Sequence, residues 1–346
     1  MDHHGPVVLC VGETMALLTP QHAPAGLWLD VHQAGAEGNV AAGLAHLGCR
    51  SRWLSRLGDD EFAPVITDFL ASRGVDVAQV VTDPERPTGL MTKSVSGTGT
   101  DQRRTRVRYA RAGSAASGLS PDDLTAAALD RVTVCHLSGI TPALSDSCAD
   151  LVEAVVVERR LGPGITVSFD VNHRPALWAD GAAGPTLHRI AAAADVVLVG
   201  LDEARELWGC RTPGAVRDLL PEPRRLVVKD GAVAAHAFVR SDDGTDHPVV
   251  QPALRAEVVE AVGAGDAFAA GYLAGLVAPD PGVPAGGGGA ELRALRLGHA
   301  LAACTLQSML DLPAWPSAEV LRSWTRLDET GWRQLHVTPA DLEGRP

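Results

Sequence analysis

Short apolar runs alternate with alanine-rich, amphipathic segments over most of the chain. These runs have the length and the appearance of buried strands: Val7–Val11, Arg52–Leu57, Val132–Leu137, Thr166–Asp170, Asp195–Val199 and Leu226–Lys229. The segments between them have helical spacing and predict helices at 37–47, 146–160, 202–208 and 214–220. This alternation predicts an α/β fold of three layers, in which helices cover both faces of a mostly parallel sheet.

Two regions interrupt this alternation. Residues 88–111 predict a hairpin in which Thr88–Val95 and Arg104–Arg111 flank a Gly-Thr-Gly-Thr-Asp turn. Together with the segment near 14–33, this hairpin predicts a small β-sheet lid that stands off the main sheet. The second region, residues 279–289, is rich in proline and glycine and predicts a mobile surface loop.

The length of 346 residues is sufficient for one large domain with a full core. We expect this domain over 1–325, followed by a polar tail over 326–346 that forms either a peripheral helix or a frayed end. A hydrophobic content of 46% and a mean hydropathy of +0.06 indicate a soluble globular protein. The net charge of −12 argues against nucleic-acid and anionic-membrane partners, although it allows a small anionic ligand.

The chain shows no sign of export or of a membrane span. Its first residues, Met-Asp-His-His-Gly, lack the cationic and apolar pattern of a signal peptide, and no run approaches eighteen apolar residues. Its 6 cysteines are scattered without C-x-x-C pairs, which argues against a disulfide framework or a zinc site. We therefore expect a cytoplasmic protein.

The segment Glu260–Gly275 predicts a tight glycine turn that opens a helix. Gly263 and Gly265 remove Cβ atoms, so that backbone N–H groups at the positive end of the helix can face an anion such as phosphate. A carboxylate is unusual beside phosphate, and Asp266 suits this place if it accepts a proton from a hydroxyl that attacks the phosphate. The alternative is an ordinary loop-to-helix junction in which Asp266 complements the helix dipole.

Two further segments offer groups that suit an anionic sugar. On the arginine-rich strand, Tyr109 and Arg111 place a ring and a fork donor two residues apart, although charge on such a strand also protects a sheet edge. The loop from Asp170 to Arg174 follows an apolar strand, where Asp170 fits a turn former. Asn172 and Arg174 are the better ligand candidates, because the turn requires neither.

Three other positions have weaker indications. Gly35 precedes an alanine-rich helix, and Asn39 either caps that helix or holds a sugar hydroxyl. Lys229 and Gly231 end a strand at a place where a loop can lie along a nucleotide. Glu203 also follows a strand and could order magnesium waters, although a carboxylate in a first helical turn is common.

Together these motifs resemble the ribokinase-like (PfkB) family of carbohydrate kinases, over roughly residues 7–315. The resemblance rests on Gly35–Gly48, on Arg56–Phe62 and on Val262–Gly275. It implies a ribokinase-like fold, ATP with Mg²⁺, and a homodimer built through the lid. It also implies that Asp266 is the catalytic base and that His299 lies near the adenine. The expected anion hole consists of the N–H groups of Gly263, Ala264 and Gly265.

Within that family the chain is similar to 2-keto-3-deoxygluconate kinases, by His136–Ser145, by Asp170–Arg174 and by Tyr109–Arg111. This similarity implies that Tyr109, Arg111 and Arg174 hold the keto-acid end of the substrate. It further implies that Gly35 and Asn39 hold the hydroxyls, and that the terminal hydroxyl becomes a 6-phosphate.

Two alternatives remain open. One is a kinase for another sugar, such as fructose or 5-dehydro-2-deoxygluconate. The other is a non-catalytic regulator that binds a sugar or nucleotide. Gly200, Glu260 and Ala261 depart from the family pattern and favour the regulator, whereas the intact segment from Gly263 to Asp266 counts against it.

Overall fold

The computed structural model describes residues 5–23, 26–96, 104–278 and 288–342. Its large sheet has the strand order β14-β13-β12-β11-β10-β9-β1-β4. Neighbours from β4 to β12 are parallel, and β12, β13 and β14 are antiparallel. The bounds of these strands are β1 Val7–Val11, β4 Arg50–Leu54, β9 Val132–Ser138, β10 Thr166–Asp170, β11 Val196–Gly200, β12 Arg225–Asp230, β13 Ala234–Arg240 and β14 Asp246–Pro252.

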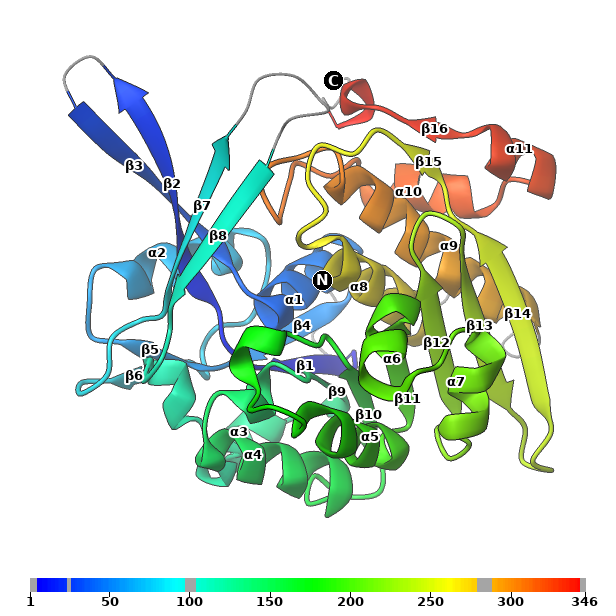
Figure 1. The fold of residues 1–346 in the computed structure, drawn as a ribbon, viewed down its shortest axis with the longest axis horizontal. Helices are drawn as coiled ribbons and strands as arrows, with labels where there is room; N and C mark the ends of the chain where they lie inside the picture. Colours follow the sequence, from blue (N-terminus) through cyan, green and yellow to red (C-terminus); the bar gives the residue numbers. More distant parts are fainter. Residues whose placement is uncertain (1–4, 24–25, 97–103, 279–287, 343–346) are drawn as a thin grey trace.

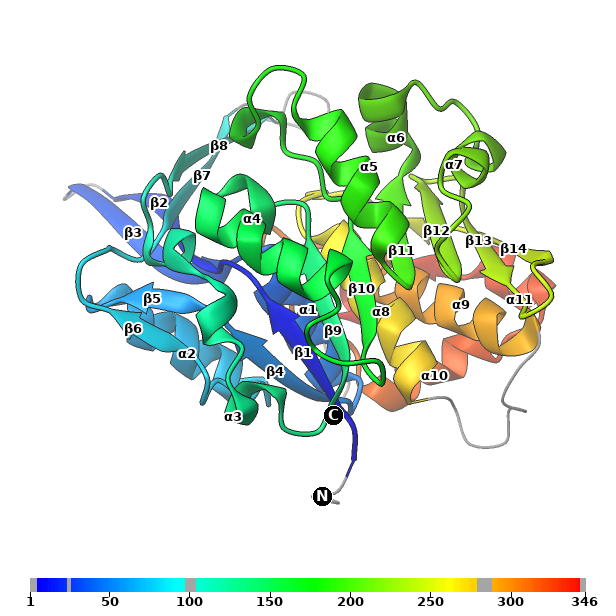
Figure 2. The same cartoon turned by 90° about the horizontal axis from the view of Figure 1, so that it is seen from below.

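Helices cover both faces of this sheet (Figures 1 and 2). One face carries α1 (Ala36–His46), α8 (Ala264–Val277), α9 (Gly288–Thr305) and α10 (Ala318–Thr325). The opposite face carries α4 (Asp146–Val152), α5 (Ala183–Ala193), α6 (Leu201–Trp208) and α7 (Pro213–Leu219). The predicted α/β fold of three layers is therefore confirmed.

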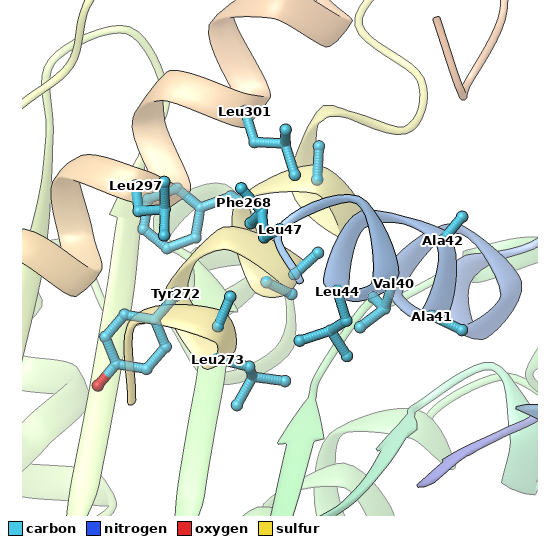
Figure 3. Close-up of a cluster of buried hydrophobic side chains, with 14 of the residues drawn as sticks. Val40, Ala41, Ala42, Leu44, Leu47, Phe268, Tyr272, Leu273, Leu297 and Leu301 are labelled. Atoms are coloured by element: carbon cyan, nitrogen blue, oxygen red, sulfur yellow. The ribbon is translucent and has the colours of Figure 1, made fainter. Parts of the chain in front are cut away.

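Side-chain alternation along the buried strands divides the core between the two faces. On β1, Val8 and Cys10 join the cluster under α1 and α8, whereas Val7 and Leu9 join the cluster under α4 and α5. Figure 3 shows the first cluster, in which Leu44 of α1, Leu273 of α8 and Leu297 of α9 lie among buried neighbours. This packing fixes the N-terminal end of α8 relative to the strand ends.

The lid is a separate sheet with the order β3-β2-β7-β8. It stands off the main body in Figure 1. Its strands are β2 Met15–Ala23, β3 Gly26–Ala34, β7 Leu90–Ser96 and β8 Arg104–Ala110. The predicted lid segments are thus confirmed as strands. The predicted hairpin turn lies outside the described residues, and so does most of the proline- and glycine-rich stretch, apart from two glycines that begin α9.

Several elements differ in detail from the sequence-based expectation. The run Arg52–Leu57 is divided between β4 and a short strand of another sheet, because the chain turns toward the lid after Leu54. The helix expected over 146–160 is α4 followed by a π-helical turn, Glu153–Val157. The remaining elements are β5 Arg56–Gly58, α2 Phe62–Ser72, β6 Val81–Asp83, α3 Ala126–Leu129, β15 Arg255–Ala256, α11 Glu329–Gln334, β16 His336–Val337 and short 3₁₀ turns.

The end of the chain packs onto the main domain. Of the two forms expected after residue 326, the structure shows the helix, as α11. Trp332 of α11 is 1% exposed, and its indole N–H donates to the Pro252 carbonyl at 2.9 Å. β16 then pairs with β15 in a two-stranded sheet. The segment is therefore packed against the domain. Within the ranges that the structure describes, no helix is long and apolar enough to cross a membrane.

Candidate active site

A pocket with an empty volume of about 460 Å³ lies between the lid and the start of α8. Most of its lining residues come from the lid strands, from the turn before α8 and from loops at the carboxyl ends of parallel strands, which is where open α/β sheets bind ligands. The lining residues include Glu13, Gly35, Asn39, Met91, Tyr109, Arg111, Arg174, Gly263, Asp266 and Asp311.

The turn that opens α8 requires glycine at position 263. Gly263 is the N-cap residue and has a φ of 85°, in the left-handed region. A Cβ at this position would also lie 3.1 Å from Asp311 Cα. Ala264 N–H donates to the Ala261 carbonyl at 3.3 Å and closes the turn. The following residues begin the helix, where N–H groups of the first turn lack intrahelical acceptors and can face an anion.

Asp266 lies in the first turn of α8 and is 8% exposed. Its Oδ2 accepts a hydrogen bond from Asn39 Nδ2 at 2.9 Å, and its Oδ1 accepts one from Asn172 Nδ2 at 3.2 Å. Burial raises the pKa of Asp266 to about 6, against the lowering effects of the Asn39 hydrogen bond and the Arg174 charge. The group is therefore an oriented carboxylate that exchanges a proton near neutral pH.

Asn39 and Asn172 reach this carboxylate from distant parts of the chain. Asn39 lies inside α1, and Gly35 is the N-cap residue of that helix, so the alternative that Asn39 caps the helix is wrong. Asn172 follows β10 with a φ of 37°, a conformation that asparagine adopts more readily than most residues. The amide of Gln33 donates to Asn39 Oδ1 at 3.2 Å, which orients the Asn39 side chain toward Asp266.

On the lid side, Arg111 is buried and paired with Glu13. The second Glu13 oxygen, Oε1, accepts the Ser114 hydroxyl at 2.5 Å. The ring of Tyr109 is 47% exposed, and its centroid lies 5.6 Å from Arg111 Cζ. Arg174 lines the pocket as an exposed side chain. The pocket thus combines one arginine that has a carboxylate partner with one that faces solvent.

Lys229 and Glu203 lie together beside the turn that opens α8. Lys229 Nζ pairs with Asp170 Oδ2 at 2.8 Å, and it lies 3.7 Å from the place where a Gly265 Cβ would be. The Glu203 oxygens accept the backbone N–H groups of Gly200 at 2.7 Å and His173 at 2.9 Å. Burial raises the pKa of Glu203, against the lowering effect of the Lys229 ammonium. In the described ranges, no cluster of three or more His, Cys, Asp or Glu side chains forms a ready metal site.

His299 lies in the interior of α9, and Gly231 in the turn after β12. The His299 ring is 7% exposed, contacts Phe268 edge-on at 5.1 Å, and hydrogen-bonds the Gln251 carbonyl through Nε2 at 3.1 Å. Burial lowers the pKa of His299 to about 4, so the ring is neutral at physiological pH. Gly231 has a φ of 49°, in the left-handed region where glycine is favoured.

The structure also places residues in or beside the pocket that the sequence-based reasoning missed. Glu13 follows β1, Asp311 follows α9, and Lys93 lies on β7 with 2% of its surface exposed. Glu13 had a usable signal, since it follows a predicted buried strand as Asp170 does. Asp311 and Lys93 had none, because neither belongs to a recognisable motif.

Comparison with known proteins identifies the family of this chain. The family model described as pfkB family carbohydrate kinase matches residues 8–318. The chain therefore belongs to the pfkB family and is a carbohydrate kinase.

Similar proteins span most of the chain. It is 34% identical to a 2-dehydro-3-deoxygluconokinase of Bacillus subtilis (strain 168), over 86% of this chain and 87% of the relative. It is also 34% identical to a 2-dehydro-3-deoxygluconokinase of Thermoproteus tenax, over 72% of this chain and 75% of the relative. The crystal structure of a PfkB protein from Polaromonas sp. JS666 has a TM-score of 0.73 at 32% identity and covers 92% of this chain and 99% of its own. The expected resemblance to PfkB kinases is thus confirmed.

Proposed function

We propose that this kinase transfers a phosphoryl group from ATP to the terminal hydroxyl of 2-keto-3-deoxygluconate and forms the 6-phosphate. Two relatives at 34% identity are named 2-dehydro-3-deoxygluconokinase. 2-Dehydro-3-deoxygluconate and 2-keto-3-deoxygluconate are two names for the same compound. The observation that carries the proposal is the position of Asp266, a buried carboxylate that lines the pocket in the first turn of α8. This arrangement places a proton acceptor beside a helix N-terminus that suits phosphate.

In this proposal Asp266 accepts the proton of the attacking hydroxyl. Asn39 and Asn172 hold its carboxylate in one orientation through the hydrogen bonds of 2.9 and 3.2 Å. The oxygen of the substrate then forms a bond to the γ-phosphorus, while the bond from that phosphorus to ADP breaks. The N–H groups of Gly263 and Gly265 are proposed to face the negative charge of the transferred group, and the Ala264 N–H joins them only if it gives up its 3.3 Å hydrogen bond to the Ala261 carbonyl.

Mg·ATP supplies the phosphoryl group. The residues of this chain fit a phosphate-bearing ligand beside α8, because Lys229 brings an ammonium within 3.7 Å of the place that a Gly265 Cβ would fill. We propose that Lys229 and Gly231 lie along the nucleotide and that Glu203 orders water around the metal. His299 is proposed to support the adenine side through its packing against Phe268, since its Nε2 already bonds to Gln251.

The substrate carboxylate is proposed to bind between Arg111 and Arg174, with Tyr109 beside it. Because Glu13 already balances the charge of Arg111, Arg174 supplies the net positive charge that favours an acid over a neutral sugar. Gly35 lines the pocket and is proposed to bind a sugar hydroxyl through its backbone. Packing also requires glycine there, since a Cβ would lie 2.3 Å from the Glu13 carbonyl oxygen.

We also propose a homodimer that forms through the lid. The edge strand β3 exposes Leu27 by 60%, Trp28 by 64% and Leu29 by 47%. A row of large apolar side chains on a sheet edge is typical of a protein–protein contact. A Trp28→Asp variant is expected to shift the protein from dimer to monomer in analytical ultracentrifugation, and an unchanged dimer would contradict the proposed interface.

The test of substrate identity is an ADP-release assay with Mg·ATP over a panel of possible acceptors. The panel contains 2-keto-3-deoxygluconate, its galacto epimer, 5-dehydro-2-deoxygluconate, gluconate, fructose and ribose. We expect the highest kcat/KM with the 2-keto-3-deoxy acids. A preference for fructose or ribose would refute the sugar-acid proposal. Tight ATP binding without turnover on any acceptor would favour a non-catalytic sugar- or nucleotide-binding regulator.

A further inference from the structure

Lysine is rare in this chain, and both lysines lie beside the candidate active site. The sequence contains 30 basic residues, of which lysines occupy positions 93 and 229. Lys93 projects from the lid strand β7 and is 2% exposed. Its Nζ donates to the Met309 carbonyl at 3.0 Å and lies 3.4 Å from Glu260 Oε2 and 3.6 Å from Asp311 Oδ1.

Both carboxylate partners of Lys93 support the turn that opens α8. Glu260 Oε1 accepts the backbone N–H groups of Ala261 at 2.9 Å and Val262 at 3.3 Å, directly before Gly263. Asp311 packs against Gly263, and its carboxylate accepts a hydrogen bond from Asn39 Nδ2 at 3.4 Å. The ammonium therefore connects the lid to the two segments that hold the proposed anion hole and the proposed base.

Three acidic side chains meet in this region, at positions 260, 266 and 311. Burial raises the pKa of Asp311, and the Lys93 ammonium acts in the opposite direction. The negative charge of Asp311 in turn contributes to the raised pKa of Asp266. A buried negative charge that loses its cationic partner becomes costly, and neighbouring carboxylates then hold their protons more tightly.

We propose that Lys93 is a positioning residue, whose ammonium is a tethered internal cation that joins the lid to the Glu260 and Asp311 segments and through them holds Asn39 and the turn before α8 in position around Asp266. The part that concerns Asp266 rests on the proposed function, whereas the structural part does not.

The kinetic test compares Lys93→Met, which keeps the length of the side chain, with Lys93→Ala, which leaves an oxygen-lined space. Thr92→Val on the same strand is the control. We expect kcat of Lys93→Met to fall about tenfold or more, with a smaller change in KM. Potassium or ammonium ions are expected to restore part of kcat in Lys93→Ala but not in Lys93→Met, because only the shorter side chain leaves room for an ion with oxygen ligands.

A second measurement needs no substrate and therefore separates this inference from the proposed function. The melting temperature of Lys93→Met is expected to fall by roughly 5–10 °C, since a buried charge pair is broken. Lys93→Met/Glu260→Gln, which removes both charges of one pair, is expected to recover part of that loss. Potassium should raise the melting temperature of Lys93→Ala relative to the same concentration of choline chloride.

Several results would overturn the proposal. An unchanged kcat in Lys93→Met would exclude a positioning effect on Asp266. A double variant that is no more stable than Lys93→Met, or that also fails to fold where Lys93→Met fails, would exclude the charge-balancing role. Equal responses of Lys93→Ala to potassium and choline would show that the space does not act as a cation site.

Discussion

Replacement of Asp266 by asparagine separates proton transfer from binding, because the two side chains have nearly the same shape. In the native protein the two carboxylate oxygens accept hydrogen bonds from Asn39 and Asn172. An asparagine offers one acceptor and one donor, so one of these contacts becomes donor against donor. Asn39 cannot simply rotate its amide, because its Oδ1 accepts the hydrogen bond from Gln33. Asn172 can, because its Oδ1 has no hydrogen-bond partner and could accept from the new amide.

The effects on stability are expected to nearly cancel. Loss of the hydrogen bonds to a charged acceptor costs about 1–3 kcal/mol. Against this, burial raises the pKa of Asp266 from the ordinary aspartate value of 3.8 to about 6. That shift of roughly two pH units means that the buried charge costs the native state about 3 kcal/mol near neutral pH, and a neutral side chain removes this cost. The melting temperature should therefore stay within a few degrees of that of the natural protein.

The effect on turnover is expected to be large. A positioned general base contributes about 10²–10⁴ to the rate, which corresponds to about 3–5 kcal/mol of barrier. The assay measures kcat and KM for 2-keto-3-deoxygluconate by ADP release, with ATP affinity and the melting temperature as controls. Asp266→Asn should lower kcat by two to four orders of magnitude and leave both affinities near normal. Near-normal turnover of a folded Asp266→Asn enzyme would refute the assignment of this base.

Three further predictions concern pH, specificity and stability. Because Asp266 must be ionised and its pKa is about 6, kcat/KM should fall about tenfold per pH unit below pH 6 and level off above it; a flat profile from pH 5 to 8 would contradict this. Arg174→Ala should raise KM strongly for a carboxylated sugar and little for fructose, and an equal effect on both would place Arg174 away from the carboxylate. Trp332→Ala should destabilise the protein by about 3–5 kcal/mol in urea, whereas Leu327→Ala, at a position 36% exposed, should cost under 1 kcal/mol; similar losses would contradict the packing of α11.

Much of the fold could be predicted because the patterns that define it are local. The run Asp195–Val199 overlaps β11, Val196–Gly200, since a strand buried on both faces needs apolar side chains at nearly every position. The junction near Leu54 was missed because the local sequence does not record which sheet a strand joins. The packing of Trp332 could not be predicted, because one tryptophan in a polar segment contains no information about the surface that covers it.

The candidate site divides in a similar way. Asp266 was predictable because two glycines and a carboxylate at the start of a helix make a motif within four positions. Its orientation was not, since Asn39 is 227 positions away and Asn172 is 94 positions away. The pairing of Arg111 with Glu13 was also hidden, because no local pattern links a strand of the lid to the loop after β1.

The sequence by itself determined the alternation of strands and helices, the glycine turn before α8, and the side chains available at the ends of the strands. Backbone hydrogen bonds and side-chain periodicity act over a few residues, so they leave a record in consecutive positions. Only the tertiary structure decided which charges meet. The placement of Lys93 between Glu260 and Asp311 follows from the packing of the lid strand β7 against the segments that precede α8 and follow α9. Interactions between buried charges depend on distance and burial, and these are properties of the packed molecule.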